Sequence, residues 1–173
     1  MITENQYRNL ALEFGISISK VKAIDFVESN GEGFDPKTGK IKIQFEPHWF
    51  KRFTNKIIDN KVDVQSREWE AFNEAYKINP IAAMESTSIG RMQVMGFHWK
   101  RLGFKSVGNM WDFAKDSEAN QLWLGLKFIE TDNRLFQAVK NWDTKKVAYY
   151  YNGVNYGVKG YDKKLTQAEI RFR

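Results

Sequence analysis

Apolar residues recur every three or four positions over most of the chain, which is the spacing of one face of a helix. Short helices are expected within residues 78–104 and just after residue 106. Elsewhere the pattern predicts longer helices at about residues 4–14 and 17–29, from Pro47, from an N-cap at Ser66, from about residue 117, at about 134–143 and 144–153, and from Lys163. The chain is therefore expected to be mainly helical.

One segment departs from this periodicity. Residues 31–39 contain three glycines and a proline, which break the helical pattern. Apolar and polar side chains then alternate over residues 40–46, which predicts a strand with one solvated face, half of a hairpin that turns near residues 36–39. We therefore expect a single, mainly α domain over residues 1–173 with a small β-hairpin insertion after the second helix.

Composition narrows the classes of function. At 173 residues, 42% hydrophobic and 15% aromatic, the chain can bury a core and is not of disordered type. No apolar run approaches the roughly 20 residues that span a bilayer, so no stable membrane insertion is expected. The polar N-terminal residues are typical of a helix and not of a signal peptide. Zero cysteines exclude thiolate catalysis, and two histidines are too few for a histidine-rich metal site, so no such metal site is expected.

The net charge of +6 is compatible with a polyanionic partner. Nucleic acid, an anionic membrane and an anionic cell wall would all fit it. The basic residues are scattered singly along the chain, which favours a solvated basic surface over a nucleic-acid site.

Glu28 is the first candidate for chemistry. It follows Val21 and Ile24 at i, i+3, i+7 spacing, so it shares their apolar helix face, while the solvent face is expected to hold Lys22, Asp25 and Ser29. Burial and the negative end of the helix dipole would both raise the pKa of this carboxyl, as a general acid requires. The alternative is a glutamate that turns outward where the helix frays or that accepts a backbone N–H.

Two further carboxylates follow Glu28. Glu46 comes 18 residues later, at the end of the predicted strand, and Asp35 lies in the loop between them. Glycoside hydrolysis commonly uses one protonated acid and one carboxylate about 5–9.5 Å apart, and either residue could supply the second group. Glu46 is equally suited to cap the helix that opens at Pro47.

Two other stretches suit ligand binding. In "STSIGRMQVMG" two glycines flank Gln93, which would let the backbone approach a ligand while the amide contacts it. In "AYYYNGVNYGVKGYD" tyrosines combine apolar faces with hydroxyls, which suits stacking on sugars or bases. The alternatives are an ordinary glycine-containing helix end for the first stretch and core packing for the second, which we expect of Tyr149 or Tyr150.

Four motifs appear in a fixed order: "VESNGEGF", "FEPHWF", "STSIGRMQVMGFHWKRLGF" and "YNGVNYGVKGYDKKL". Together they resemble the N-acetylmuramidase domain of phage endolysins, from about Lys20 to the C-terminus. More distantly they are similar to goose-type lysozymes and lytic transglycosylases. The resemblance implies a lysozyme-like, mainly helical fold and cleavage of the glycan strand of bacterial peptidoglycan.

The resemblance also implies roles for individual residues. Glu28 matches the catalytic acid of an ES motif, and Glu46 occupies a position of the "FEPH" motif. Ser29, Gln93, Tyr151, Asn152 and Tyr156 fall at positions that imply substrate binding. Two positions depart from the family pattern, because Ile89 and Met92 stand where aromatic residues are usual.

The expected function is therefore that of a muramidase, a glycosidase that hydrolyses the β-1,4 bond between N-acetylmuramic acid and N-acetylglucosamine. Its partner would be the peptidoglycan glycan strand, with no nucleic acid, no cofactor and a monomeric state. Without a signal peptide it would accumulate in the cytoplasm of a phage-infected host and act on the wall after the membrane is permeabilised. The alternatives are a lytic transglycosylase, which leaves 1,6-anhydro ends, and a non-catalytic module that binds wall glycan or nucleic acid.

Overall fold

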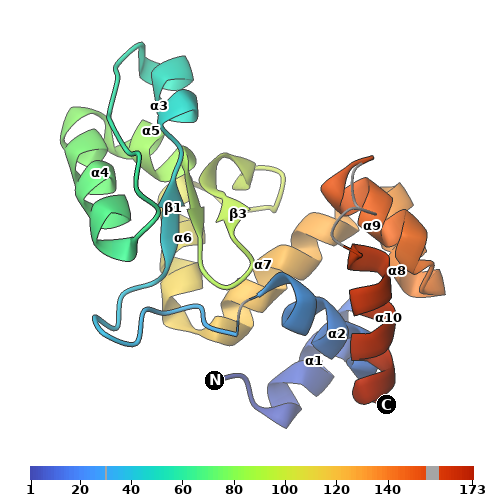
Figure 1. Ribbon diagram of the computed structural model, residues 1–173. Helices are drawn as coiled ribbons and strands as arrows, with labels where there is room; N and C mark the ends of the chain where they lie inside the picture. Colours follow the sequence, from blue (N-terminus) through green and yellow to red (C-terminus); the bar gives the residue numbers. More distant parts are fainter. Residues whose placement is uncertain (30, 155–159) are drawn as a thin grey trace. The chain divides into compact units, whose positions relative to one another are not determined.

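The computed structural model describes residues 1–29, 31–154 and 160–173, over which the chain is mainly α-helical (Figure 1). Among the described helices, none combines the length and apolar character that a membrane span requires. In this described part ten α-helices form: α1 (Glu4–Phe14), α2 (Ile18–Glu28), α3 (Pro47–Thr54), α4 (Gln65–Ile78), α5 (Pro80–Glu85), α6 (Val107–Asp116), α7 (Glu118–Glu130), α8 (Asn133–Asn141), α9 (Thr144–Asn152) and α10 (Tyr161–Arg171).

The chain divides into two compact units. The first contains Met1–Gly31 and Leu126–Arg173, and the second contains Glu32–Gly125, so the boundary at Leu126 falls inside α7.

In the first unit α2 packs against both α1 and α10, and Figure 1 shows α10 running beside α2. Ser17 caps the N-terminus of α2 by accepting the N–H of Lys20. A buried hydrogen bond of 2.9 Å from the Ser19 hydroxyl to Glu169 Oε1 joins α2 to α10. These contacts fix the helix that ends at Glu28.

The predicted solvent face of α2 is wrong at two positions, because Asp25 and Ser29 are buried and Phe26 is 54% exposed. The Asp25 carboxylate accepts hydrogen bonds from the Tyr7 hydroxyl at 2.5 Å and from the Ser29 hydroxyl at 3.1 Å, which makes its burial tolerable. The Phe26 ring packs edge-on to Phe172 of the same unit.

The second unit contains a three-stranded antiparallel sheet with the order β1 (Ile43–Phe45), β2 (Thr87–Ile89), β3 (Val94–Met95). The predicted strand is present as β1, and the turn before it is present too, with a bridge between Phe34 and Ile41. The main partner of β1 is nevertheless β2, with Ile43 opposite Ile89, and not the segment that precedes the turn. A short 3₁₀ helix, η1 (Gly96–His98), follows β3.

Helix α4 lies beside β1 (Figure 1). Two of its side chains bond the strand, because Glu68 Oε2 accepts the N–H of Phe45 at 2.6 Å and Gln65 bonds Ile43. The Gln65 amide accepts the N–H of Ile43 at 3.0 Å and donates to its carbonyl at 2.9 Å. The N-cap of α4 is Val64, which makes no side-chain capping bond, so the predicted N-cap at Ser66 is wrong. The contact with the strand, and not a cap, fixes where this helix begins.

Candidate active site

Glu28 is the last residue of α2 and is partly buried. Loss of solvent around the carboxyl raises the pKa of Glu28 from 4.5 to about 8. Its place at the C-terminal end of the helix disfavours the charged form as well. The carboxyl therefore carries its proton at neutral pH and can donate it, as the sequence pattern predicts.

Tyr151 of α9 lies close enough to Glu28 to be affected by its charge. Burial, and then the negative charge of Glu28, raise the pKa of Tyr151 well above its usual value. The Tyr151 ring stacks on Tyr161, with centroids 6.5 Å apart and planes at 13°, and meets Phe128 edge-on at 6.4 Å. The structure thus brings together two of the predicted site residues, a protonated acid and a neutral phenol.

The other predicted residues of the tyrosine-rich segment are arranged differently. Asn152 ends α9 and is exposed, and Tyr156 lies outside the described residues. The expectation that Tyr149 or Tyr150 belongs to the core is wrong, because Tyr149 is 47% exposed and Tyr150 is partly exposed. Among the described tyrosines of the segment, the buried one is Tyr161, at the start of α10.

Ser29 follows Glu28 directly, but its hydroxyl is directed into the protein. It donates to the Asp25 carbonyl at 2.6 Å and to the Asp25 carboxylate at 3.1 Å, and it accepts the N–H of Gly31 at 3.3 Å. The side chain is buried. This geometry suits a residue that fixes the direction of the chain after Glu28 better than one that contacts a sugar.

Glu46, in the second unit, occupies the N-cap position of α3 without making a side-chain capping bond. Its Oε2 lies 3.5 Å from His48 Nδ1, and the side chain is 28% exposed. Burial raises the pKa of Glu46; the charge of His48 opposes this shift and the charge of Glu68 adds to it. The capping alternative therefore does not account for this carboxylate, which remains accessible for chemistry.

The Asp35 carboxylate is occupied by hydrogen bonds within the turn that it begins. Its carboxylate accepts the N–H of Lys37 at 3.0 Å and the hydroxyl of Thr38 at 2.8 Å. These hydrogen bonds hold the pKa of Asp35 below its usual value. The geometry is typical of a turn-stabilising aspartate, so of the two candidates Glu46 fits the second catalytic group better.

Gln93 closes the turn between β2 and β3. Its backbone adopts a φ of 48°, and its side chain accepts the Ser88 hydroxyl at 2.7 Å and donates to the Gly90 carbonyl at 2.8 Å. The residue is exposed, although both ends of its amide have partners within the turn. The atypical residues are both buried, Ile89 at the end of β2 and Met92 within the turn.

The loop that follows Glu28 is anchored by a polar cluster that the sequence did not reveal. Gly33 donates its N–H to Glu118 at 2.8 Å, and the buried Gln121 accepts the N–H of Arg91 at 2.8 Å. Arg91 and Glu118 also form an ion pair at 3.3 Å. A Cβ at Gly33 or Gly90 would lie 1.8 or 2.7 Å from the Gln121 side chain, so both positions need glycine for this close approach.

Aromatic side chains of α3 and η1 form a second feature that sequence reasoning missed. The Trp49 ring lies 4.7 Å from Phe97 and 5.7 Å from Phe53, and Phe53 is 41% exposed. His48 and His98 extend the cluster at its two sides. The sequence signal for this cluster was the pair of aromatic runs "HWF" (48–50) and "FHW" (97–99), but only the fold brings them together. The first run follows Glu46 closely in sequence.

Within the described residues no group of three or more acidic, histidine or cysteine side chains could hold a metal ion.

A family model for N-acetylmuramidases matches residues 17–173, so the chain belongs to the N-acetylmuramidase family. Membership makes it a peptidoglycan-degrading muramidase, and the resemblance seen in the sequence is confirmed. Among solved structures, the crystal structure of the Burkholderia AP3 phage endolysin is 31% identical, with a TM-score of 0.90 over 99% of this chain and 70% of that one. No curated protein matches the sequence significantly.

Proposed function

We propose that this muramidase hydrolyses the β-1,4 bond between N-acetylmuramic acid and N-acetylglucosamine, with Glu28 as the general acid. The observation that carries the proposal is the position of Glu28, a protonated carboxyl at the end of α2 with a pKa of about 8. The similarity to a phage endolysin supports a role in cell-wall lysis.

In the proposed step Glu28 gives its proton to the glycosidic oxygen, and the bond between that oxygen and the sugar C1 breaks with its electron pair on oxygen. In the inverting route a water molecule bonds to C1 and loses a proton to the second carboxylate. In the retaining route that carboxylate bonds to C1 first; water then displaces it from C1 and loses a proton to Glu28, now a carboxylate, which restores the acid. We assign the second carboxylate to Glu46, because its side chain is accessible and makes no capping bond. Tyr151, neutral and next to Glu28, would contact the sugar.

The direct test is to digest purified peptidoglycan and to analyse the released sugars by mass spectrometry before and after borohydride reduction. We expect reducible muramic acid ends, and Glu28→Gln should lower turnover by at least about 10²-fold with the fold intact by circular dichroism. Anhydro ends, one water lighter and unreduced, would make the enzyme a lytic transglycosylase. Release of no sugar by the wild type would support a binding module instead.

A paired comparison tests the second carboxylate. Glu46→Gln should lower kcat by roughly 10²-fold, whereas Asp35→Asn should leave kcat within about threefold, because Asp35 acts in its turn. The opposite ranking of the two variants would reassign the group to Asp35. Full activity in both would favour the transglycosylase, which can work with one acid.

A further inference from the structure

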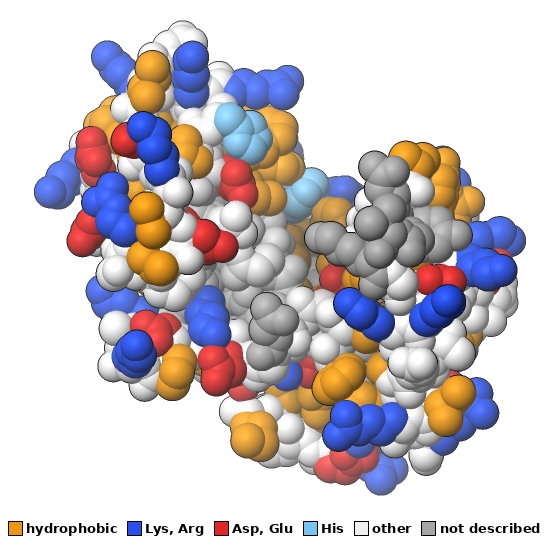
Figure 2. Space-filling model, viewed as in Figure 1, with side chains coloured by type: hydrophobic (Ala, Val, Ile, Leu, Met, Phe, Trp, Pro, Cys, Tyr) orange, Lys and Arg blue, Asp and Glu red, His pale blue; other side chains and the backbone are white. Residues whose placement is uncertain are grey.

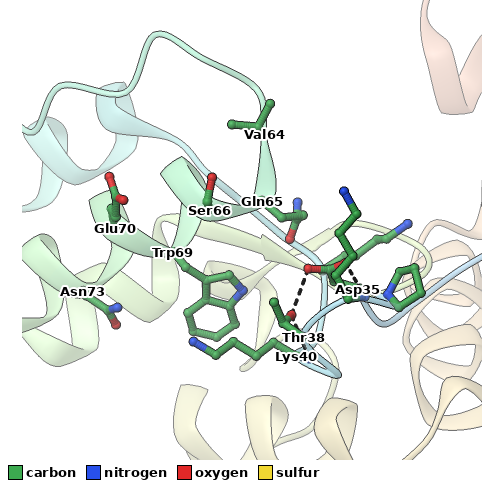
Figure 3. Close-up of a pocket in the computed structure, with 12 residues that line it drawn as sticks. Asp35, Thr38, Lys40, Val64, Gln65, Ser66, Trp69, Glu70 and Asn73 are labelled. Atoms are coloured by element: carbon green, nitrogen blue, oxygen red, sulfur yellow. Dashed lines mark hydrogen bonds between the residues drawn. The ribbon is translucent and has the colours of Figure 1, made fainter.

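A pocket of about 670 Å³ lies in the second unit between the 35–42 segment and the first turns of α4 (Figure 3). This volume is in the range of small-ligand sites. Apart from Asp35, whose carboxylate is used in its turn, none of the residues that line it belongs to the catalytic or substrate-binding set proposed above.

The floor of the pocket is the indole of Trp69. Figure 3 shows it at the centre, with Ser66 on one side and Lys40 on the other. Edge-on contacts with Phe72 at 5.4 Å and Trp111 at 6.4 Å hold the ring in place. Its Nε1–H is buried and has no hydrogen-bond partner in the described structure, so a ligand in the pocket would contact the ring and not this donor. The ring is thus a rigid apolar platform.

The charges around the platform are arranged asymmetrically. Glu70 is paired with Arg67, and Lys42 is paired with Glu32. Lys37 and Lys40 form no ion pair among the described residues, although the charge of Lys37 acts on the Asp35 carboxylate of the same lining. Lys40 Nζ lies over the Trp69 ring, 5.2 Å from its centre. A ligand that enters the pocket would therefore meet the two ammonium groups of Lys37 and Lys40, and it would stack on the ring where the flexible Lys40 side chain moves aside.

Two uncharged polar groups complete the lining. Ser66 and Asn73, one turn of α4 before and after Trp69, are exposed and make no hydrogen bond within the described part of the chain. A hydroxyl and an amide at the edge of an aromatic platform suit a ligand that carries hydroxyl or acetamido groups on a ring.

We propose that this pocket is a second saccharide site, which stacks one sugar ring on Trp69 and binds a carboxylate on that sugar through Lys40 and Lys37. The choice of an acidic saccharide rests on the proposed function, because muramyl units of the wall carry a lactyl group whose carboxylate is free or extended by a peptide stem. The site would hold a stretch of wall glycan remote from the bond that is cut.

The test is titration of the uniformly ¹⁵N-labelled protein with N-acetylmuramic acid, following the indole N–H signal of Trp69 by NMR. Trp69→Phe assigns that signal. A monosaccharide has no glycosidic bond, so the result does not depend on whether Glu28 is catalytic. We expect a saturable shift of this signal in the millimolar range, and about tenfold weaker binding of the methyl ester of the sugar.

The double variant Lys37→Gln/Lys40→Gln should lose the response, while Lys100→Gln/Lys105→Gln, which removes two exposed charges elsewhere in the unit, should keep it. An equal response to N-acetylglucosamine would overturn the acidic specificity. An equal response to thymidine monophosphate or inorganic phosphate would make the pocket a general anion site and overturn the proposal. Absence of any shift at Trp69 would overturn it outright.

Discussion

The burial that raises the pKa of Glu28 also bears on stability. The unfolded chain releases this proton near pH 4.5, whereas the folded protein keeps it to about pH 8. Between these values the folded state binds more protons than the unfolded state, so the free energy of unfolding falls as pH rises through this window. The group that equips the enzyme for proton transfer therefore destabilises the fold at neutral and alkaline pH.

Replacement of Glu28 should accordingly stabilise the protein. A pKa shift of this size corresponds to a few kcal/mol, and after a discount for partial exposure we expect Glu28→Gln to gain about 1–2 kcal/mol at pH 8. Near pH 5 the gain should be much smaller, because wild-type Glu28 is then protonated when folded. Urea unfolding at the two pH values measures this, with Glu74→Gln as the exposed control. An equal gain at both pH values would contradict the assignment.

The same carboxyl sets a pH dependence of catalysis. Because a general acid must hold its proton, kcat should fall as pH rises through about 8, by close to tenfold for each further unit. Initial rates of peptidoglycan solubilisation measured between pH 6 and pH 10 would reveal this fall in kcat. If kcat stayed constant up to pH 10, Glu28 could not be the proton donor.

Where α5, η1 and α6 pack together, there is no room for a side chain at Gly96, the first residue of η1. A Cβ there would lie 1.9 Å from the Met84 carbonyl oxygen, a backbone atom that also accepts the indole N–H of Trp111. Gly96→Ala should therefore cost about 3 kcal/mol. Gly108→Ala is the matched control, since its nearest neighbour would be Ser106 Oγ at 3.6 Å and alanine favours the helix. Thermal unfolding of both variants checks the contrast; a similar Tm for the two would contradict it.

The periodicity of the chain predicted the helices well, because an apolar stripe is a local pattern. It failed where long-range contacts reverse the local preference. Asp25 is buried because Tyr7, 18 residues earlier, donates a hydrogen bond to it, and Phe26 stays at the surface beside Phe172 near the end of the chain. The partner of β1 comes from 46 residues later at the Ile43–Ile89 pair, a distance that alternation within one strand cannot encode.

In the candidate site, too, local features could be predicted from the sequence and long-range contacts could not. The place of Glu28 at the end of an apolar helix face could be read from spacing, and so could its raised pKa. The partners of Ser29 and Gln93 could not be predicted, since each hydroxyl or amide has several possible acceptors nearby. The contact of Trp49 with Phe97 joins segments 48 residues apart, and only the folded second unit reveals it.

For the whole molecule, the charge of +6 is spread over the surface, and Figure 2 shows lysine and arginine side chains scattered on the visible face among acidic ones. Such a surface attracts an anionic cell wall through interactions that salt screens. Lysis of whole cells should therefore fall severalfold between about 10 mM and 150 mM salt, a range over which the Debye length shortens from about 30 to 8 Å. Turbidity assays measure this, with cleavage of a short neutral glycan as the control; equal salt dependence of the two would contradict wall attraction.

The division of the chain into a continuous unit and a discontinuous one has a consequence for the order of events during synthesis. Glu32–Gly125 can fold as soon as it leaves the ribosome, but α2 must wait for α10, against which it packs and which is made some 130 residues later. Until then α2 is supported by α1 alone, and Glu28 lacks the neighbouring Tyr151 and the burial that raises its pKa. A growing chain therefore gains its proton donor only after α10 has been made, and a product interrupted before α10 would lack the raised pKa of Glu28.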